Sequence, residues 1–123
     1  MYAAVTALPP DQPALRLTVE RSGERTVVGV AGELDIATAD QFATGLREEL
    51  ASRPVLLELS ELAFVDSSGL RAIDALLEAV DREGWTLRIG PDLAPGVRQV
   101  LEMTGMIELL PIENAPGSAG DLR

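Results

Sequence analysis

The sequence contains no cysteine, no histidine and no lysine, and these absences exclude several kinds of chemistry. Without cysteine and histidine, disulfides, thiol nucleophiles and zinc sites of the Cys/His type are excluded. Histidine-based acid–base catalysis and the Ser-His-Asp triad are excluded as well. We therefore expect a protein that is not an enzyme and that has no catalytic residue, no metal site and no cofactor.

Positive charge and long hydrophobic runs are also scarce. Ten basic residues, all arginine, stand against 20 acidic residues, which gives a net charge of −10. A field of this sign repels nucleic acid and anionic membranes and suits a partner with a basic face. No stretch approaches the roughly 20 apolar residues of a membrane span, and the features of a signal peptide are missing. These observations predict a cytoplasmic protein that binds neither nucleic acid nor membrane.

The length of 123 residues is that of one domain. Aromatic residues make up only 3%, so the core must be aliphatic. Residues 1–13 carry three prolines, and residues 114–123 are rich in Pro, Gly, Ser and Ala. These compositions predict a flexible N-terminal arm and a flexible C-terminal tail. Residues 14–113 are expected to form a single domain that is monomeric when free.

Apolar periodicity predicts alternating strands and helices within this domain. The predicted strands are Leu15–Val19, Arg25–Ala31, Val55–Leu59 and Trp85–Ile89. Helices are predicted from Thr38, from Ser67 to Gly84 and from Asp92 to Gly105, with Thr38 and Asp92 as caps. We expect a loop at Gly32–Asp35, and a strand or a last helix at Met106–Leu110. This order is typical of an α/β sandwich, a small mixed β-sheet of four to five strands covered by three to four helices.

The segment Asp66-Ser67-Ser68-Gly69 stands between a predicted strand and a predicted helix. Backbone N–H groups at the start of a helix are free and favour negative charge. A phosphate on a serine there would be tolerated by the fold and sensed by a partner. Taken alone, Asp-Ser before an apolar helix is most often only an N-cap. Both interpretations, a cap and a phosphorylation site, stand at this point.

Three segments together resemble the STAS domain of the bacterial anti-sigma factor antagonist type. They are Gly32–Asp35 followed by Thr38-Ala39, Phe64–Leu70, and Val100–Met106. The similarity runs from about Leu15 to Ile112, which is nearly all of the predicted domain. The resemblance implies a STAS-like sandwich.

The resemblance also implies a partner-switching function. In such proteins the unphosphorylated antagonist binds an anti-sigma factor that is also a serine kinase, and the sigma factor is released. The kinase phosphorylates the first serine of the Asp-Ser-Ser-Gly motif, which is Ser67 here. A separate serine phosphatase restores the binding form. Ser68 is the candidate for a second modified site.

Partner-binding residues are implied in the same way. Asp35 matches the acidic residue of a loop that lies near the phosphorylated serine in the family. Arg71 stands where a small residue is common, directly after Gly69-Leu70. The predicted partner-binding residues are Asp35, Asp66, Ser67, Ser68, Gly69 and Arg71.

Two other functions were weighed against this hypothesis. A STAS subunit of a transport or lipid-trafficking complex would share the fold without being phosphorylated, but the intact Ser67 favours the antagonist. A serine hydrolase would need a base for Ser67, and the sequence has neither histidine nor a Gly-x-Ser-x-Gly elbow. No Gly-rich phosphate loop with lysine is present, so no nucleotide cofactor is expected.

Overall fold

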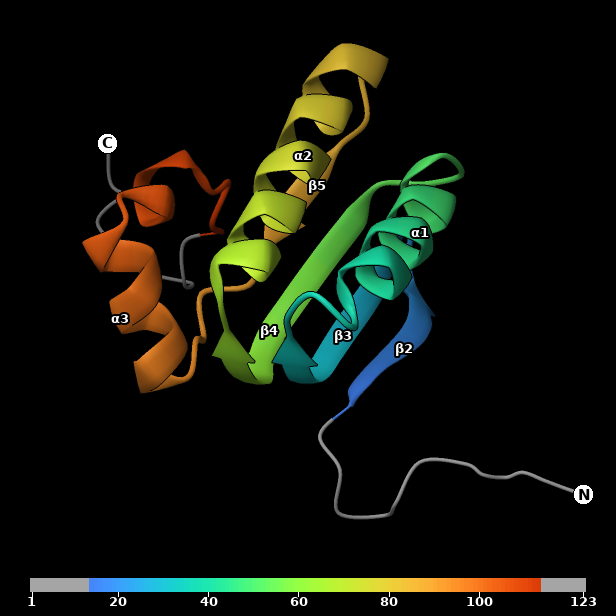
Figure 1. Ribbon diagram of the computed structural model, residues 1–123. Coiled ribbons are helices and arrows are strands. Elements are labelled where there is room, and N and C mark those ends of the chain that lie inside the picture. The colour runs from blue at the N-terminus through green and yellow to red at the C-terminus, as the bar shows by residue number, and fades with distance from the viewer. Residues whose placement is uncertain (1–13, 114–123) are drawn as a thin grey trace, which may run out of the picture.

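Four strands form one mixed sheet in the part of the chain that the structure describes, residues 14–113 (Figure 1). The computed structural model orders them β2-β3-β4-β5, with β2 antiparallel to β3 and the other neighbours parallel. The predicted mixed α/β sheet is confirmed, whereas the predicted arm 1–13 and tail 114–123 lie outside the described residues. The elements are β2 (Leu15–Ser22), β3 (Arg25–Leu34), α1 (Ala39–Leu50), β4 (Val55–Val65), α2 (Ser67–Glu83), β5 (Leu87–Ile89), α3 (Pro95–Met103) and the 3-10 helix η1 (Met106–Leu109).

Helices α1 and α2 lie side by side over one face of the sheet, and α3 packs beside β4 (Figure 1). The buried face of α1 consists of Phe42, Leu46 and Leu50, as their spacing by four predicted. Ile73 and Leu76 of α2 join the same cluster. Phe42 is the one aromatic side chain among the fully buried residues of the described chain, so the core is aliphatic as the composition required.

Two β-bulges alter the side-chain alternation of β4. The strand holds one extra residue where β3 passes from Gly29 to Ala31, and another where β3 passes from Gly32 to Glu33. Each extra residue changes the spacing of core-facing side chains from two to three. The core-facing residues of β4 are therefore Val55, Leu57, Leu59, Leu62 and Val65.

The bulges explain two predicted boundaries that were wrong. The strand predicted to end at Leu59 continues to Val65, because the period of two stops at the first bulge while the pairing with β3 does not. The residues Gly32–Leu34 were predicted as loop but form the last part of β3. Asp35 is thus the first residue beyond the sheet, directly after the buried Leu34.

The helix ends follow the sequence in one case and depart from it in another. Gly84 ends α2 in the left-handed region, with φ of 73°, as predicted. The prediction that Asp92 caps the next helix was wrong, because α3 begins at Pro95 after Ala94 and has no side-chain cap. Proline is favoured at the first helical position, where its missing N–H costs nothing. The segment predicted as a strand or a last helix is the 3-10 helix η1.

Candidate functional site

The carboxyl ends of β3 and β4 lie next to each other because these strands are parallel and Leu34 pairs with Val65. The N–H of Asp66 donates to the carbonyl of Leu34 over 3.3 Å, which holds the first residue after β4 against the last residue of β3. Asp35 and Asp66 each follow one of these strand ends directly. The structure therefore brings these two predicted site residues to the same edge of the sheet, beside the start of α2 (Figure 1).

Asp66 is the N-cap of α2, and Ser67 is the first residue of that helix. The Oδ1 atom of Asp66 accepts a hydrogen bond from the N–H of Gly69 at 3.0 Å, and its carbonyl accepts one from the N–H of Leu70 at 2.8 Å. Ser67 is exposed, and its hydroxyl takes part in none of the hydrogen bonds within residues 14–113. Ser68 is half-buried. The capping role thus belongs to Asp66, which leaves Ser67 with a free, accessible hydroxyl.

Gly69 is buried, although we expected it at the partner-binding surface. A Cβ atom added there would lie 2.5 Å from the carbonyl oxygen of Leu34 and 2.7 Å from Cγ2 of Val65. Both distances are shorter than real Cβ contacts allow. Gly69 therefore lets the first turn of α2 approach the ends of β3 and β4, and this packing positions Ser67.

The loop after β3 is held by hydrogen bonds between Asp35 and the residues that follow it. Its Oδ1 atom accepts from the N–H of Ala37 at 3.0 Å, and its own N–H donates to Oγ1 of Thr38 at 3.0 Å. The Thr38 hydroxyl donates in turn to the carbonyl of Glu33 at 2.8 Å. Thr38 was predicted to cap α1 with its side chain, but it occupies the N-cap position without a side-chain cap bond and ties the loop back to β3 instead.

Two apolar side chains near this edge were missed in the sequence. Ile36 is 81% exposed in the loop after Asp35, and Phe64 is 45% exposed at the end of β4. Phe64 pairs with Glu33, so it lies at the same end of the sheet as Asp35. Exposed large apolar residues beside a polar cluster are typical of protein interfaces. The signal available in the sequence was their position, each within two residues of a motif aspartate.

Arg71 lies one helical turn after Ser67 and is exposed. Residues four apart on an α-helix are neighbours on its surface, with about 5–6 Å between their Cβ atoms. None of the ion pairs within residues 14–113 involves Arg71. The guanidinium is therefore available for contacts outside the present fold.

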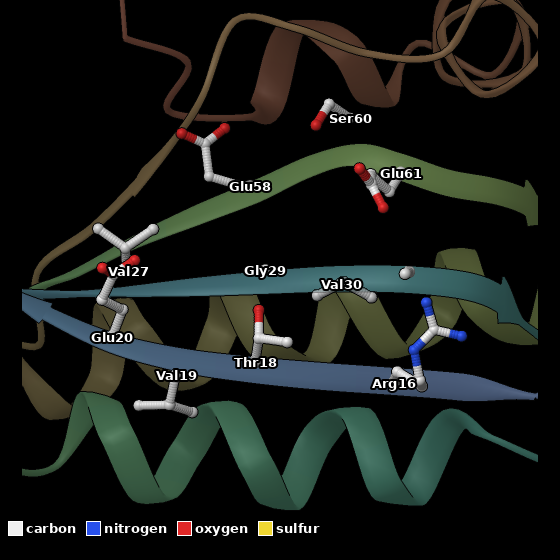
Figure 2. Close-up of a pocket in the computed structure, with 11 residues that line it drawn as sticks. Arg16, Thr18, Val19, Glu20, Val27, Gly29, Val30, Glu58, Ser60 and Glu61 are labelled. Atoms are coloured by element: carbon white, nitrogen blue, oxygen red, sulfur yellow. The ribbon is translucent and has the colours of Figure 1, made fainter.

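A groove lies on the face of the sheet opposite α2, away from Ser67 (Figure 2). This groove has a volume of about 560 Å³, and small residues of β3, Gly29 and Ala31, form its floor. Figure 2 shows Thr18 on β2 beside Gly29, and Glu58, Ser60 and Glu61 on β4 along the other side. None of the predicted site residues lines the groove.

Residues 14–113 hold no group of three or more acidic side chains placed to ligate a metal ion. Among the same residues, no helix has the length and hydrophobicity needed to cross a bilayer.

A family model for the STAS domain matches residues 16–119. The chain belongs to the STAS domain family. It is 30% identical over 101 residues to an anti-sigma F factor antagonist of Paenibacillus polymyxa, an alignment that spans 80% of this chain and 86% of that protein. The match includes every residue of the site described above, from Asp35 to Arg71.

Solved STAS structures agree with the fold. A crystal structure of an anti-sigma factor antagonist from Mycobacterium paratuberculosis superposes with a TM-score of 0.71 and 26% identity, over 88% of this chain and 91% of that one. The anti-sigma factor antagonist SpoIIAA, in its unphosphorylated form, gives a TM-score of 0.63 at 18% identity, over 83% and 90% of the two chains. The second comparison concerns the STAS fold alone.

Proposed function

We propose that this STAS protein is an anti-sigma factor antagonist controlled by phosphorylation of Ser67. The unphosphorylated form binds an anti-sigma factor that is also a serine kinase, and the bound sigma factor is released. The kinase then phosphorylates Ser67 and the complex dissociates, until a serine phosphatase removes the phosphate. The observation that carries this proposal is the exposed, unbonded Ser67 hydroxyl at the start of α2, in a chain related to anti-sigma factor antagonists.

The proposed binding surface surrounds Ser67. Ile36 supplies exposed apolar area, Asp35 supplies a carboxylate held by the backbone, and Arg71 supplies a positive charge. Apolar contacts at the centre of such a surface provide affinity, and charged residues at its rim provide specificity and a fast encounter. The net charge of −10 matches a partner with a basic face.

Electrostatic magnitudes favour control of binding over control of folding. A phosphate adds about −1.5 to −2 charges near neutral pH. We place the partner's basic face away from Ser67 and an apolar or acidic contact opposite it. Against such a contact, one like charge at about 4 Å costs roughly 4 kcal/mol at an effective dielectric of about 20, and about 1.4 kcal/mol is a tenfold change in affinity. Ser67 is exposed and takes part in none of the hydrogen bonds within residues 14–113, so its modification removes no contact of the fold. The phosphate therefore acts on a bound partner, where water is excluded, more than on the protein itself.

The proposal is tested with the kinase that binds the unphosphorylated protein. This kinase is purified together with the protein as a complex. The purified pair is incubated with ATP, and the modified residue is identified by mass spectrometry. We expect the phosphate on Ser67, none on the Ser67→Ala variant, and unchanged modification of Ser67 in the matched variant Ser68→Ala. Ser67→Ala is expected to remain bound after ATP is added, while the parent protein dissociates. Modification elsewhere, or no modification, would reject the switch and favour the STAS subunit of a transport or lipid-trafficking complex.

We further propose that the protein works in the cytoplasm, as a monomer when free, and without enzymatic activity or a cofactor of its own. The absence of histidine and cysteine supports a regulatory role, because Ser67 has no base that could activate it as a nucleophile. The acidic charge opposes self-association and binding to nucleic acid. Sedimentation of the purified full chain would measure the monomeric state directly.

A further inference from the structure

The positive end of α2 is already partly used by the protein itself. The Asp66 carboxylate accepts the N–H of Gly69, and the Asp66 carbonyl accepts the N–H of Leu70. A capping carboxylate also neutralises part of the positive charge at a helix N-terminus. A phosphate on Ser67 would therefore gain less from the start of this helix than from an uncapped one, and it needs another source of positive charge.

The residues around Ser67 offer one such source. In the two strand ends and the first two turns of α2, residues 33–35 and 64–74, Arg71 is the single basic residue. The other charged residues of these segments are Glu33, Asp35, Asp66 and Asp74, and Asp40 lies in the first turn of the neighbouring helix α1. Within these segments, a phosphate at Ser67 would meet several carboxylates and one attracting side chain, Arg71.

The spacing between Ser67 and Arg71 allows direct contact. An acidic group four residues before a basic one is the more favourable order of such a pair on a helix. On α3 the same spacing of four residues joins two exposed side chains, because Arg98 and Glu102 approach to 3.8 Å. A phosphoserine has about the reach of a glutamate and offers three acceptor oxygens to the guanidinium.

We propose that Arg71 binds the phosphate of phosphorylated Ser67 through charge-assisted hydrogen bonds and is thereby withdrawn from the partner-binding surface. This inference rests on the proposed function, in which Ser67 is the modified residue. Phosphorylation then has two effects on the complex, because it adds negative charge and also removes the positive charge of Arg71. Arg71 is a positioning residue in this switch, and it has no role in the chemistry of phosphate transfer.

The test uses the full chain with phosphoserine introduced at position 67 during translation, so that no kinase is needed. Phosphorus NMR then follows the second ionisation of the phosphate as a function of pH. A nearby guanidinium favours the dianion, so Arg71→Ala is expected to raise this pKa by about 0.15–0.4 units. Arg71→Lys should keep the phosphate pKa close to that of the parent. Added salt should reduce the difference in pKa between the parent and Arg71→Ala. Arg82→Ala, at the far end of the same helix, is the matched control and should leave the pKa unchanged.

The outcomes separate this inference from the proposed function. Equal phosphate pKa values in the parent and in Arg71→Ala would overturn the role of Arg71, whether or not a kinase modifies Ser67. Equal increases in Arg71→Ala and Arg82→Ala would overturn it as well, because they would indicate the overall charge of the protein and not a specific contact. A kinase that fails to modify Ser67 would reject the proposed function while leaving the measured contact intact.

Discussion

Two surfaces of this STAS domain each combine an exposed serine with nearby carboxylates, yet they are built differently. At the start of α2, Ser67 is accompanied by Asp66 and Asp35, and both carboxylates accept backbone N–H groups. In the groove on the opposite face, Ser60 stands between Glu58 and Glu61 (Figure 2). Neither glutamate takes part in a hydrogen bond or ion pair within the described residues.

The two surfaces contain similar residue types but differ in whether their carboxylates are held by the backbone, and this difference affects the cost of binding a partner. Carboxylates that are already bonded to the backbone lose little conformational freedom when a partner binds, whereas free glutamates must be ordered at a cost of about 0.5–1.5 kcal/mol each. The Ser67 surface also has the apolar side chain of Ile36 exposed directly after Asp35. These differences support the proposed binding surface at the edge of the sheet beside α2, although the groove lies on the opposite face.

The largest expected effect comes from adding one negative charge to each surface. Ser67→Glu should weaken the anti-sigma factor complex by at least about a hundredfold, because a like charge within the interface costs several kcal/mol. Ser60→Glu adds the same charge on the opposite face and should change the affinity less than about threefold. Titration calorimetry on the two variants measures both values. Equal losses of affinity would mean that the partner contacts both faces, and the comparison would fail.

The next effect concerns the packing that positions Ser67. Gly69→Ala should lower the free energy of unfolding by about 1–3 kcal/mol, because its Cβ would lie 2.5 Å from a backbone oxygen of β3. Gly96→Ala is the matched control in α3, where nothing lies within 4 Å of the added atom. From helix propensity, we expect Gly96→Ala to leave the free energy of unfolding unchanged or to raise it by up to about 1 kcal/mol. Urea unfolding of both variants decides this, and an unaffected Gly69→Ala would show that α2 can move away from the sheet at little cost.

Two substitutions of Asp35 separate the effect of its charge from the effect of its hydrogen bond. Asp35→Ala removes the acceptor for the N–H of Ala37 and should cost about 1 kcal/mol of stability. Asp35→Asn keeps an acceptor oxygen and should remain within about 0.5 kcal/mol of the parent. Both variants lack the charge, so both should slow phosphorylation of Ser67 to a similar extent. Phosphorylation of Asp35→Asn at the parental rate would restrict Asp35 to a structural role.

The smallest effect concerns a carboxylate bound by a side chain instead of the backbone. Glu113 accepts a hydrogen bond from Arg25 at 2.6 Å, and this bond holds the pKa of Glu113 below its ordinary value of 4.5. Because the pKa is lowered in the fold, the ionised Glu113 stabilises the fold at pH values above 4.5. This stabilisation is lost as the pH falls through the lowered pKa and the carboxylate is protonated. Glu113→Gln should therefore cost up to about 0.5 kcal/mol at neutral pH and nothing in strong acid. Glu83→Gln is the control, because the contact of Glu83 with Arg82 is longer, at 3.7 Å, and joins two exposed side chains; it should change the free energy of unfolding less than Glu113→Gln at neutral pH.

Much of the fold was predictable because it depends on local patterns. The strand pattern of Leu15 and Leu17, the β-branched composition of β3, the spacing of Phe42, Leu46 and Leu50, and the stop at Gly84 each agree with the structure, whereas Val19 is exposed. The predictions failed where pairing with another strand overrides the local pattern. The two bulges of β4 are maintained by its register with β3, and no period in residues 55–65 reveals that register. The first turn of α3 is set by Pro95, although Asp92 is the better capping residue by type.

The sequence by itself determined that this protein has an aliphatic core, a strongly acidic surface and a Ser-Ser pair between a strand and a helix. These properties follow from composition and short-range periodicity, which act within a few residues. Only the tertiary structure decided that Asp66 is the cap and Ser67 the free hydroxyl, that Gly69 is buried against Leu34, and that Ile36 is exposed. These facts depend on the parallel pairing of β3 with β4, which brings together residues about thirty positions apart in the chain.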